Sequence, residues 1–121
     1  MVLKANIAVD YVVDEDASVT FESPKPIDLA LPLAALSFQF AWDASVVGTV
    51  TFYASIYPDP YKWEKLVNCG CIEFDTADSE TQTELVALTG IWLTTGFIKF
   101  IFVPADGSIG FMSVAARIVP V

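Results

Sequence analysis

Histidine is absent from this chain of 121 residues, and basic residues are scarce, with 6 Lys and Arg against 15 Asp and Glu. Without histidine there is no Ser-His-Asp or Cys-His nucleophile, no imidazole metal ligand, and no side chain that titrates near neutral pH without perturbation. The few cations form no cluster along the chain. Because phosphate binding needs grouped Lys and Arg, we expect no nucleic-acid or anionic-membrane partner. The sequence therefore predicts a protein that is not an enzyme, with no catalytic residue and no cofactor.

Long hydrophobic runs are also missing. The longest uncharged stretches cover residues 29–42, 44–58 and 85–98. Each is too short for a membrane-spanning helix and is interrupted by Pro, Gly, Ser or Thr. The first residues carry one lysine but no apolar segment of the usual length before Asp10, so no secretory signal is predicted. We expect one soluble domain over residues 1–121.

Apolar residues are what the chain has in excess. It is 55% hydrophobic and 17% charged, whereas soluble domains average about 45–50% and about 25%. The apolar positions alternate with a period of two and are dominated by Val, Ile, Phe and Trp, which favours β-strands. We predict an all-β fold, an antiparallel, jelly-roll-like β-sandwich of about eight strands. The expected strands cover residues 3–13, 18–22, 36–42, 46–56, 71–75, 83–88, 97–103 and 109–119.

The segments between these strands carry turn residues. Asp106-Gly107 predicts a hairpin that pairs residues 97–103 with 109–119. Prolines 24 and 26 predict a crossover outside the sheet, so residues 1–36 are expected to form an added strand or arm plus that crossover. Within this part, residues 27–35 contain Pro32 and are expected to form a covered loop or a short edge strand. A free apolar edge at residues 3–13 would favour aggregation, so we expect it to pair with a sheet edge, of this chain or of a neighbouring subunit.

Two groups of residues could bind metals. Cys69 and Cys71 are separated by one glycine. Zinc usually takes four N or S ligands, and a disulfide between positions i and i+2 of a strand is near its geometric limit. The favoured interpretation is two small buried thiols with no metal, although a metal shared between subunits is an alternative. Mass spectrometry of the alkylated protein would determine their oxidation state.

The acidic residues gather in two places, and neither matches a dedicated calcium loop. They are favoured as solvated segments that keep the protein soluble, with structural calcium and catalysis as alternatives. The two groups are Asp14-Glu15-Asp16, and Asp75, Asp78, Glu80 and Glu84.

Aromatic residues offer a candidate ligand or partner site. Tyr57, Tyr61 and Trp63 surround the loop Pro58-Asp59-Pro60 and could stack on sugar rings. The alternative is that Trp63 and Trp42 pack in the core of the sandwich, since tryptophan is usually well buried.

Residues 37–121 resemble a pattern found in small structural proteins of tailed and other icosahedral bacteriophages. The resemblance rests on these segments: Phe38-Gln39-Phe40-Ala41-Trp42, then residues 47–55, then Trp63-Glu64-Lys65-Leu66, and finally residues 97–102, 107–110 and 114–118. It implies a jelly-roll-like virion protein, located in the head decoration, a spike, a fibre or the tail, with other virion proteins as partners.

Two functions follow from these patterns. The first is a non-enzymatic structural protein of a virus particle, a homo-oligomer in which the apolar excess covers subunit interfaces. The alternative is a carbohydrate-binding β-sandwich module that uses Tyr57, Tyr61 and Trp63 and takes a glycan as partner.

Overall fold

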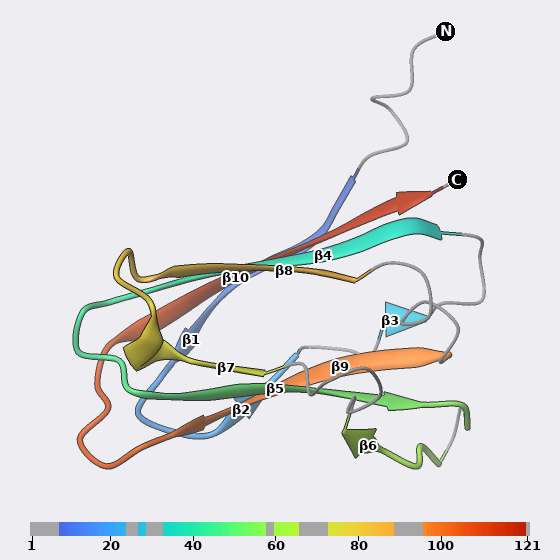
Figure 1. The fold of residues 1–121 in the computed structure, drawn as a ribbon. Coiled ribbons are helices and arrows are strands. Elements are labelled where there is room, and N and C mark those ends of the chain that lie inside the picture. The colour runs from blue at the N-terminus through green and yellow to red at the C-terminus, as the bar shows by residue number, and fades with distance from the viewer. Residues whose placement is uncertain are drawn as a thin grey trace, which may run out of the picture.

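The fold is a jelly-roll-like antiparallel β-sandwich, seen here in a computed structural model that describes residues 8–23, 27–28, 33–57, 60–65, 73–88 and 96–120. Over these ranges the chain forms ten strands and one turn of 3-10 helix. The strands make two sheets that lie face to face (Figure 1). Cys69, Cys71 and Trp92 lie outside the described residues.

One layer is a four-stranded sheet in which the last strand of the chain is central. The strand order is β1 (Ala8–Asp16), β10 (Phe111–Pro120), β4 (Leu33–Trp42) and β8 (Thr83–Leu88). The predicted amino-terminal strand therefore pairs within the chain: β1 lies antiparallel to β10. The residues expected to pair with a sheet edge do so from Ala8 onward.

The other layer is a six-stranded sheet built around β5 (Gly48–Ser55) and β9 (Phe97–Pro104). β9 pairs with β5 on one side and with two short strands on the other, so it is central, as its two apolar faces predict. Of residues 27–35, which were expected to form a covered loop or a short edge strand, residues 27–28 form such a strand, whereas residues 33–35 belong to β4 and pair with β10. The remaining strands of this sheet are β2 (Phe21–Glu22) and β3 (Ile27–Asp28) beside β9, and β6 (Glu64–Lys65) and β7 (Glu73–Asp75) beside β5.

The predicted hairpin between residues 97–103 and 109–119 is wrong, because β9 and β10 belong to different sheets. The turn itself forms, with Gly107 at φ 84° and the Ser108 amide donating to the Ala105 carbonyl over 3.2 Å. After the turn, the Ile109 amide donates to the Ser45 carbonyl. These bonds direct the chain across the end of the sandwich instead of back along β9.

The buried Ser108 hydroxyl holds this end together. It donates to the Ala17 carbonyl over 2.8 Å and accepts from the Val47 amide over 3.0 Å. Ser108 is 6% exposed and Ala17 is fully buried, so the bond between them satisfies two groups that would otherwise be buried without a partner. Three connections, β1 to β2, β4 to β5 and β9 to β10, are thus joined by one side chain.

Aromatic rings fill the space between the layers. Phe38 and Phe40 of β4 meet Phe52 of β5 and Phe100 of β9, with centroid distances from 5.1 to 6.1 Å. All four side chains are fully buried. Trp42 joins this core at 7% exposure and stacks on Phe74 of β7 at 5.7 Å, which confirms the prediction of a core tryptophan.

The acidic segment after β7 is folded more tightly than a loop. Residues Thr76–Asp78 form a 3-10 turn that Asp75 caps by accepting a hydrogen bond from the Ala77 amide. Thr76 is buried, whereas Asp78 and Glu80 are exposed to solvent, as expected of a solvated acidic segment.

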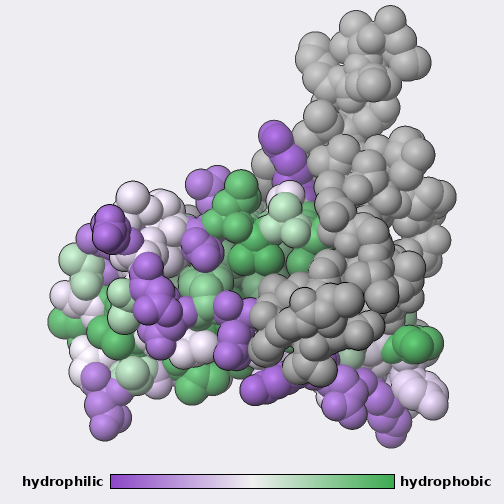
Figure 2. Space-filling model, in the orientation of Figure 1, coloured by the Kyte–Doolittle hydropathy of each residue, from purple (hydrophilic) through white to green (hydrophobic). Residues whose placement is uncertain are grey.

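Figure 2 shows the side of the molecule on which β7 and β8 lie. Apolar side chains gather on this side, between hydrophilic ones. In the described ranges, no helix has the length and apolar character that a membrane crossing requires.

Candidate functional site

The outer face of the six-stranded sheet carries polar and aromatic side chains. Along β5, Val50, Phe52 and Ala54 point into the core, so Tyr53 lies on the opposite face. Register pairs Tyr53 with Lys99 of β9 and with Lys65 of β6, which places these three residues on that outer face.

Tyr61 and Trp63 lie at one end of this face as a stacked pair. Their ring centroids are 4.9 Å apart with an interplanar angle of 23°. Phe97 meets Tyr61 edge-on at 5.3 Å, and both Tyr61 and Trp63 are half-buried. Trp63 therefore lies on the outer surface of the sandwich, and the alternative that it packs in the core is wrong.

Lys99 approaches the same tryptophan with its charged end. Its Nζ lies 4.7 Å from the centroid of the Trp63 ring, within the range of a cation–π contact. The ammonium also pairs with Glu22 Oε1 at 3.4 Å. The Lys99 side chain is 12% exposed and that of Glu22 is 56% exposed, so the carboxylate is open to solvent beside the aromatic rings. We call Tyr61, Trp63, Lys99 and Glu22 the aromatic corner.

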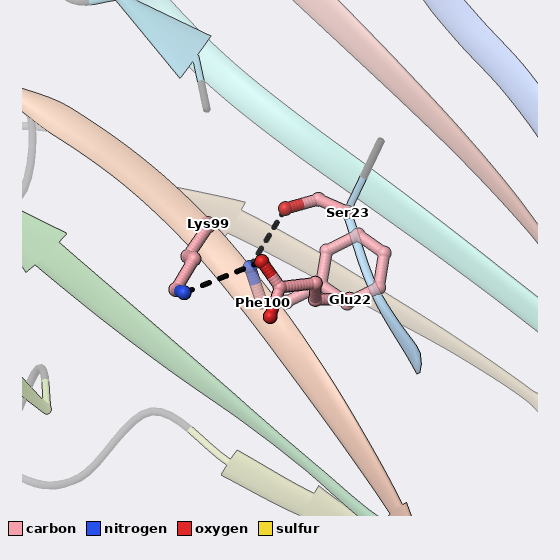
Figure 3. A network of polar contacts seen from close by, with 4 residues as sticks. All are labelled: Glu22, Ser23, Lys99 and Phe100. Carbon is pink, nitrogen blue, oxygen red and sulfur yellow. Dashed lines mark hydrogen bonds and ion pairs between the residues drawn. The ribbon is translucent and has the colours of Figure 1, made fainter. Parts of the chain in front are cut away.

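Ser23 fixes the strand that carries Glu22. Its amide donates to the Phe100 carbonyl over 3.0 Å, and the Phe100 amide donates to the Ser23 hydroxyl over 3.3 Å. Figure 3 shows the hydrogen bond from the Phe100 amide to the Ser23 hydroxyl beside the ion pair of Lys99 and Glu22. In each pair, one residue is on β9 and the other is at the end of β2 or directly after it. Glu22 therefore has a defined position relative to β9.

Ser55 shapes the loop that brings Tyr57 and Tyr61 to this end of the sheet. Its hydroxyl accepts hydrogen bonds from the amides of Tyr57 and Lys62 at 3.1 and 2.8 Å and donates to the Tyr57 carbonyl at 3.0 Å. The Tyr57 side chain is 61% exposed. Of the three predicted site residues, Tyr61 and Trp63 are in direct contact, and Tyr57 makes no ring contact with either.

The sequence does not predict the roles of Lys99 and Glu22. They are 77 positions apart, and neither lies in a recognisable motif. The signal that could have indicated Lys99 is its position, because it is the one charged residue in the otherwise apolar segment 97–103.

The acidic cluster Asp14-Glu15-Asp16, at the end of β1, lies on the four-stranded sheet and is held by local hydrogen bonds. Asp16 Oδ1 accepts hydrogen bonds from the Ser18 hydroxyl at 2.7 Å and from the Ser18 amide at 2.9 Å. These bonds, that of the hydroxyl first, lower the pKa of Asp16 below its ordinary value. In the part of the chain that the structure describes, no three Cys, Asp or Glu side chains are grouped as metal ligands would be.

Comparison with known proteins finds matches among solved structures and not among families or curated proteins. No family model matches this chain, and no curated protein matches it. Among solved structures, the chain is similar to TmCBM61 in complex with beta-1,4-galactotriose, a carbohydrate-binding module. The TM-score is 0.47 at 14% sequence identity, over 90% of this chain and 81% of that one. A likeness this distant carries no conclusion about the function of this chain.

Proposed function

We propose that this domain is a non-enzymatic module that binds carbohydrate at the aromatic corner. The observation that carries the proposal is the contact of the stacked Tyr61 and Trp63 rings with the ion pair of Lys99 and Glu22. Sugars present apolar C–H faces and hydroxyl edges. A binding site for them needs aromatic surface together with a few fixed polar groups.

The geometry supports a rigid site. Tyr61 and Trp63 hold each other, Phe97 supports Tyr61, and Ser55 fixes the loop between the strands. Rigid aromatic side chains lose little entropy on binding, which favours affinity. Lys99 covers part of one Trp63 face. We therefore expect the sugar to lie against the exposed part of the Tyr61 and Trp63 pair, with its hydroxyl groups near Glu22 and the exposed Tyr57 ring.

The first test is a titration of the protein with a panel of neutral and uronic-acid oligosaccharides, followed by tryptophan fluorescence and calorimetry. Trp63→Ala is expected to weaken binding of the best sugar by at least about tenfold, equivalent to about 1.4 kcal/mol. Glu22→Gln removes the ion pair without changing size and should also weaken binding. Trp42→Phe is the matched control, because Trp42 is buried in the core and should leave affinity unchanged.

Two outcomes would contradict the proposal: no binding anywhere on the panel, or equal affinity of wild type and a folded Trp63→Ala variant. The sugars should also keep their chain length after incubation with the protein, because no hydrolysis is expected.

A structural role in a virus particle, with other virion proteins as partners, is the second candidate. The observation that favours it is the number of large apolar side chains left exposed on the described surface, since such residues mark protein interfaces when they gather. These are Val19, Val47, Ile56, Tyr57, Leu85, Val103, Ile109 and Phe111. Light scattering tests its first requirement, self-association, and a chain that is monomeric at every concentration would contradict it.

A further inference from the structure

The outer face of the four-stranded sheet is exposed and is not used by the aromatic corner, which lies on the other layer. On β4 and β10, Phe40 and Val114 are buried in the core, whereas Gln39 and Ala115 are paired in register and point outward. Leu85 of β8 pairs with Gln39 and is 65% exposed. This face thus combines polar, small and apolar side chains.

A hollow of about 460 Å³ lies at one end of this face. Leu85 forms its apolar wall, and Arg117 supplies a positive charge. The remaining lining residues are Ser37, Gln39, Ala115 and Ala116.

The other end of the same face has the opposite character. Phe111 is 59% exposed there, beside a smaller hollow of about 230 Å³ that Asp14 and Asp43 help to line. Asp16 is the register partner of Phe111 and adds a third carboxylate. One end of the face therefore has an apolar ring among acidic groups, and the other has a hollow beside a cation.

We propose that two copies of this chain form a two-fold dimer through the outer faces of their four-stranded sheets. Phe111 of each copy fills the hollow of the other, and Arg117 of each copy meets the Asp14, Asp16 and Asp43 group of the other. A two-fold interface requires one surface that is complementary to itself. This face meets that requirement, because it carries both shapes and both charges.

The positions along β10 fit this symmetry. Phe111 and Arg117 are six residues apart, or roughly 20 Å on an antiparallel strand. Val114 lies midway between them. A two-fold axis that lies between the two sheets at the level of Val114, perpendicular to β10, therefore places Phe111 of one copy opposite Arg117 of the other. The outward Ser113 and Ala115 beside the axis are small enough for two sheets to approach to about 10 Å.

A second copy is favoured over an unrelated partner because each copy offers a cation to the carboxylates of the other. Lys62, Lys65 and Lys99 are on the six-stranded sheet or its loops, so Arg117 is the cation that β10 contributes to this face. Two copies stacked in parallel would place Phe111 over Phe111 and carboxylates over carboxylates, and like charges opposed at an interface are unfavourable. The antiparallel arrangement instead places each Arg117 against the carboxylates of the other copy.

The test is the molar mass from light scattering over a concentration series, with no sugar present. Wild type should rise from the 13.2 kDa of the monomer toward twice that value. Phe111→Ser should raise the dissociation constant by at least about tenfold, as loss of an aromatic anchor does. Ile109→Ser is the matched control, because Ile109 is 60% exposed against 59% for Phe111 but lies in the loop before β10.

A charge exchange tests the orientation of the two copies. Arg117→Asp alone should weaken the dimer, and the double variant Arg117→Asp with Asp14→Arg should restore it, because each new charge again meets its opposite. Three results would overturn the proposal: a wild type that is monomeric at every concentration, a Phe111→Ser variant that dimerises like wild type, or an Ile109→Ser variant that is equally impaired. Carbohydrate binding is measured separately and is unaffected by these outcomes, since the two proposals share no residue.

Discussion

Asp16 is the residue whose protonation the structure links most directly to local contacts. Two hydrogen bonds from Ser18 stabilise its charged form, that of the hydroxyl more than that of the amide, and its pKa is lowered. A carboxyl with a lowered folded-state pKa contributes stability above its unfolded-state pKa, and this contribution is lost as pH falls through the folded-state value. Acidification thus weakens the turn after β1.

Ser18→Ala should raise the pKa of Asp16 part of the way to its ordinary value, because the amide of residue 18 still donates. Carbon-detected NMR titration of the side-chain carboxyl measures this change. Ser45→Ala, an exposed serine in another loop, should leave the titration of Asp16 unchanged. A Ser18→Ala variant with the wild-type pKa would contradict the assigned cause.

At the same scale, the sequence predicts that Tyr61 and Trp63 lie close together but not which residues lie beside them, and the third candidate, Tyr57, makes no ring contact with either. Tyr61 and Trp63 are two positions apart, so their contact depends on a short loop. Glu22 reaches Lys99 because β2 pairs with β9, a contact across 77 positions. Long-range register of this kind depends on the whole fold, and a local pattern does not contain it.

Among the elements, β8, β9 and β10 begin and end close to the predicted positions because alternating apolar residues define them. The error is in their pairing. Asp106-Gly107 favours a tight turn but does not determine where the chain goes afterwards. Ile98, Phe100 and Phe102 of β9 and Met112, Val114 and Ala116 of β10 are all buried. The two strands contribute these side chains from opposite layers, so the pattern of burial is the same as for a hairpin while the sheets differ.

Gly48 sets how closely β5 approaches β9. A Cβ at this position would lie 2.5 Å from the Val103 carbonyl oxygen and 2.6 Å from the Phe102 ring. Gly48→Ala must therefore displace a backbone atom, and we expect it to lower the free energy of unfolding by about 1–3 kcal/mol or more. Urea denaturation measures the change.

The neighbouring Thr49→Ala is the control for this element, because Thr49 is half-buried on the outer face. Its cost should stay below about 1 kcal/mol, the span of strand propensities. If the two variants lost equal free energy of unfolding, the close approach of β5 and β9 would not be the reason that position 48 needs glycine.

For the whole molecule, the apolar excess that first distinguished this chain is divided between two places. Part of it is the core, where phenylalanine rings from both sheets meet. Other apolar side chains of the described residues are exposed, including Leu85 and Phe111 on one sheet face. Composition alone cannot separate these two uses, since a buried and an exposed phenylalanine contribute equally to it.

Substituting one core phenylalanine and one exposed phenylalanine by alanine distinguishes these two uses of apolar residues. Phe100 contacts Phe38, Phe40 and Phe52, so Phe100→Ala should lower the free energy of unfolding by about 3–5 kcal/mol, a large share of the usual total. Phe111→Ala, studied at concentrations where the chain is monomeric, should stay within about 0.5 kcal/mol of wild type. Because the rings join both layers, tryptophan fluorescence and far-ultraviolet circular dichroism should report the same midpoint in each variant. Separate midpoints would mean that the two sheets unfold independently, and an equal cost at both positions would contradict the burial that distinguishes them.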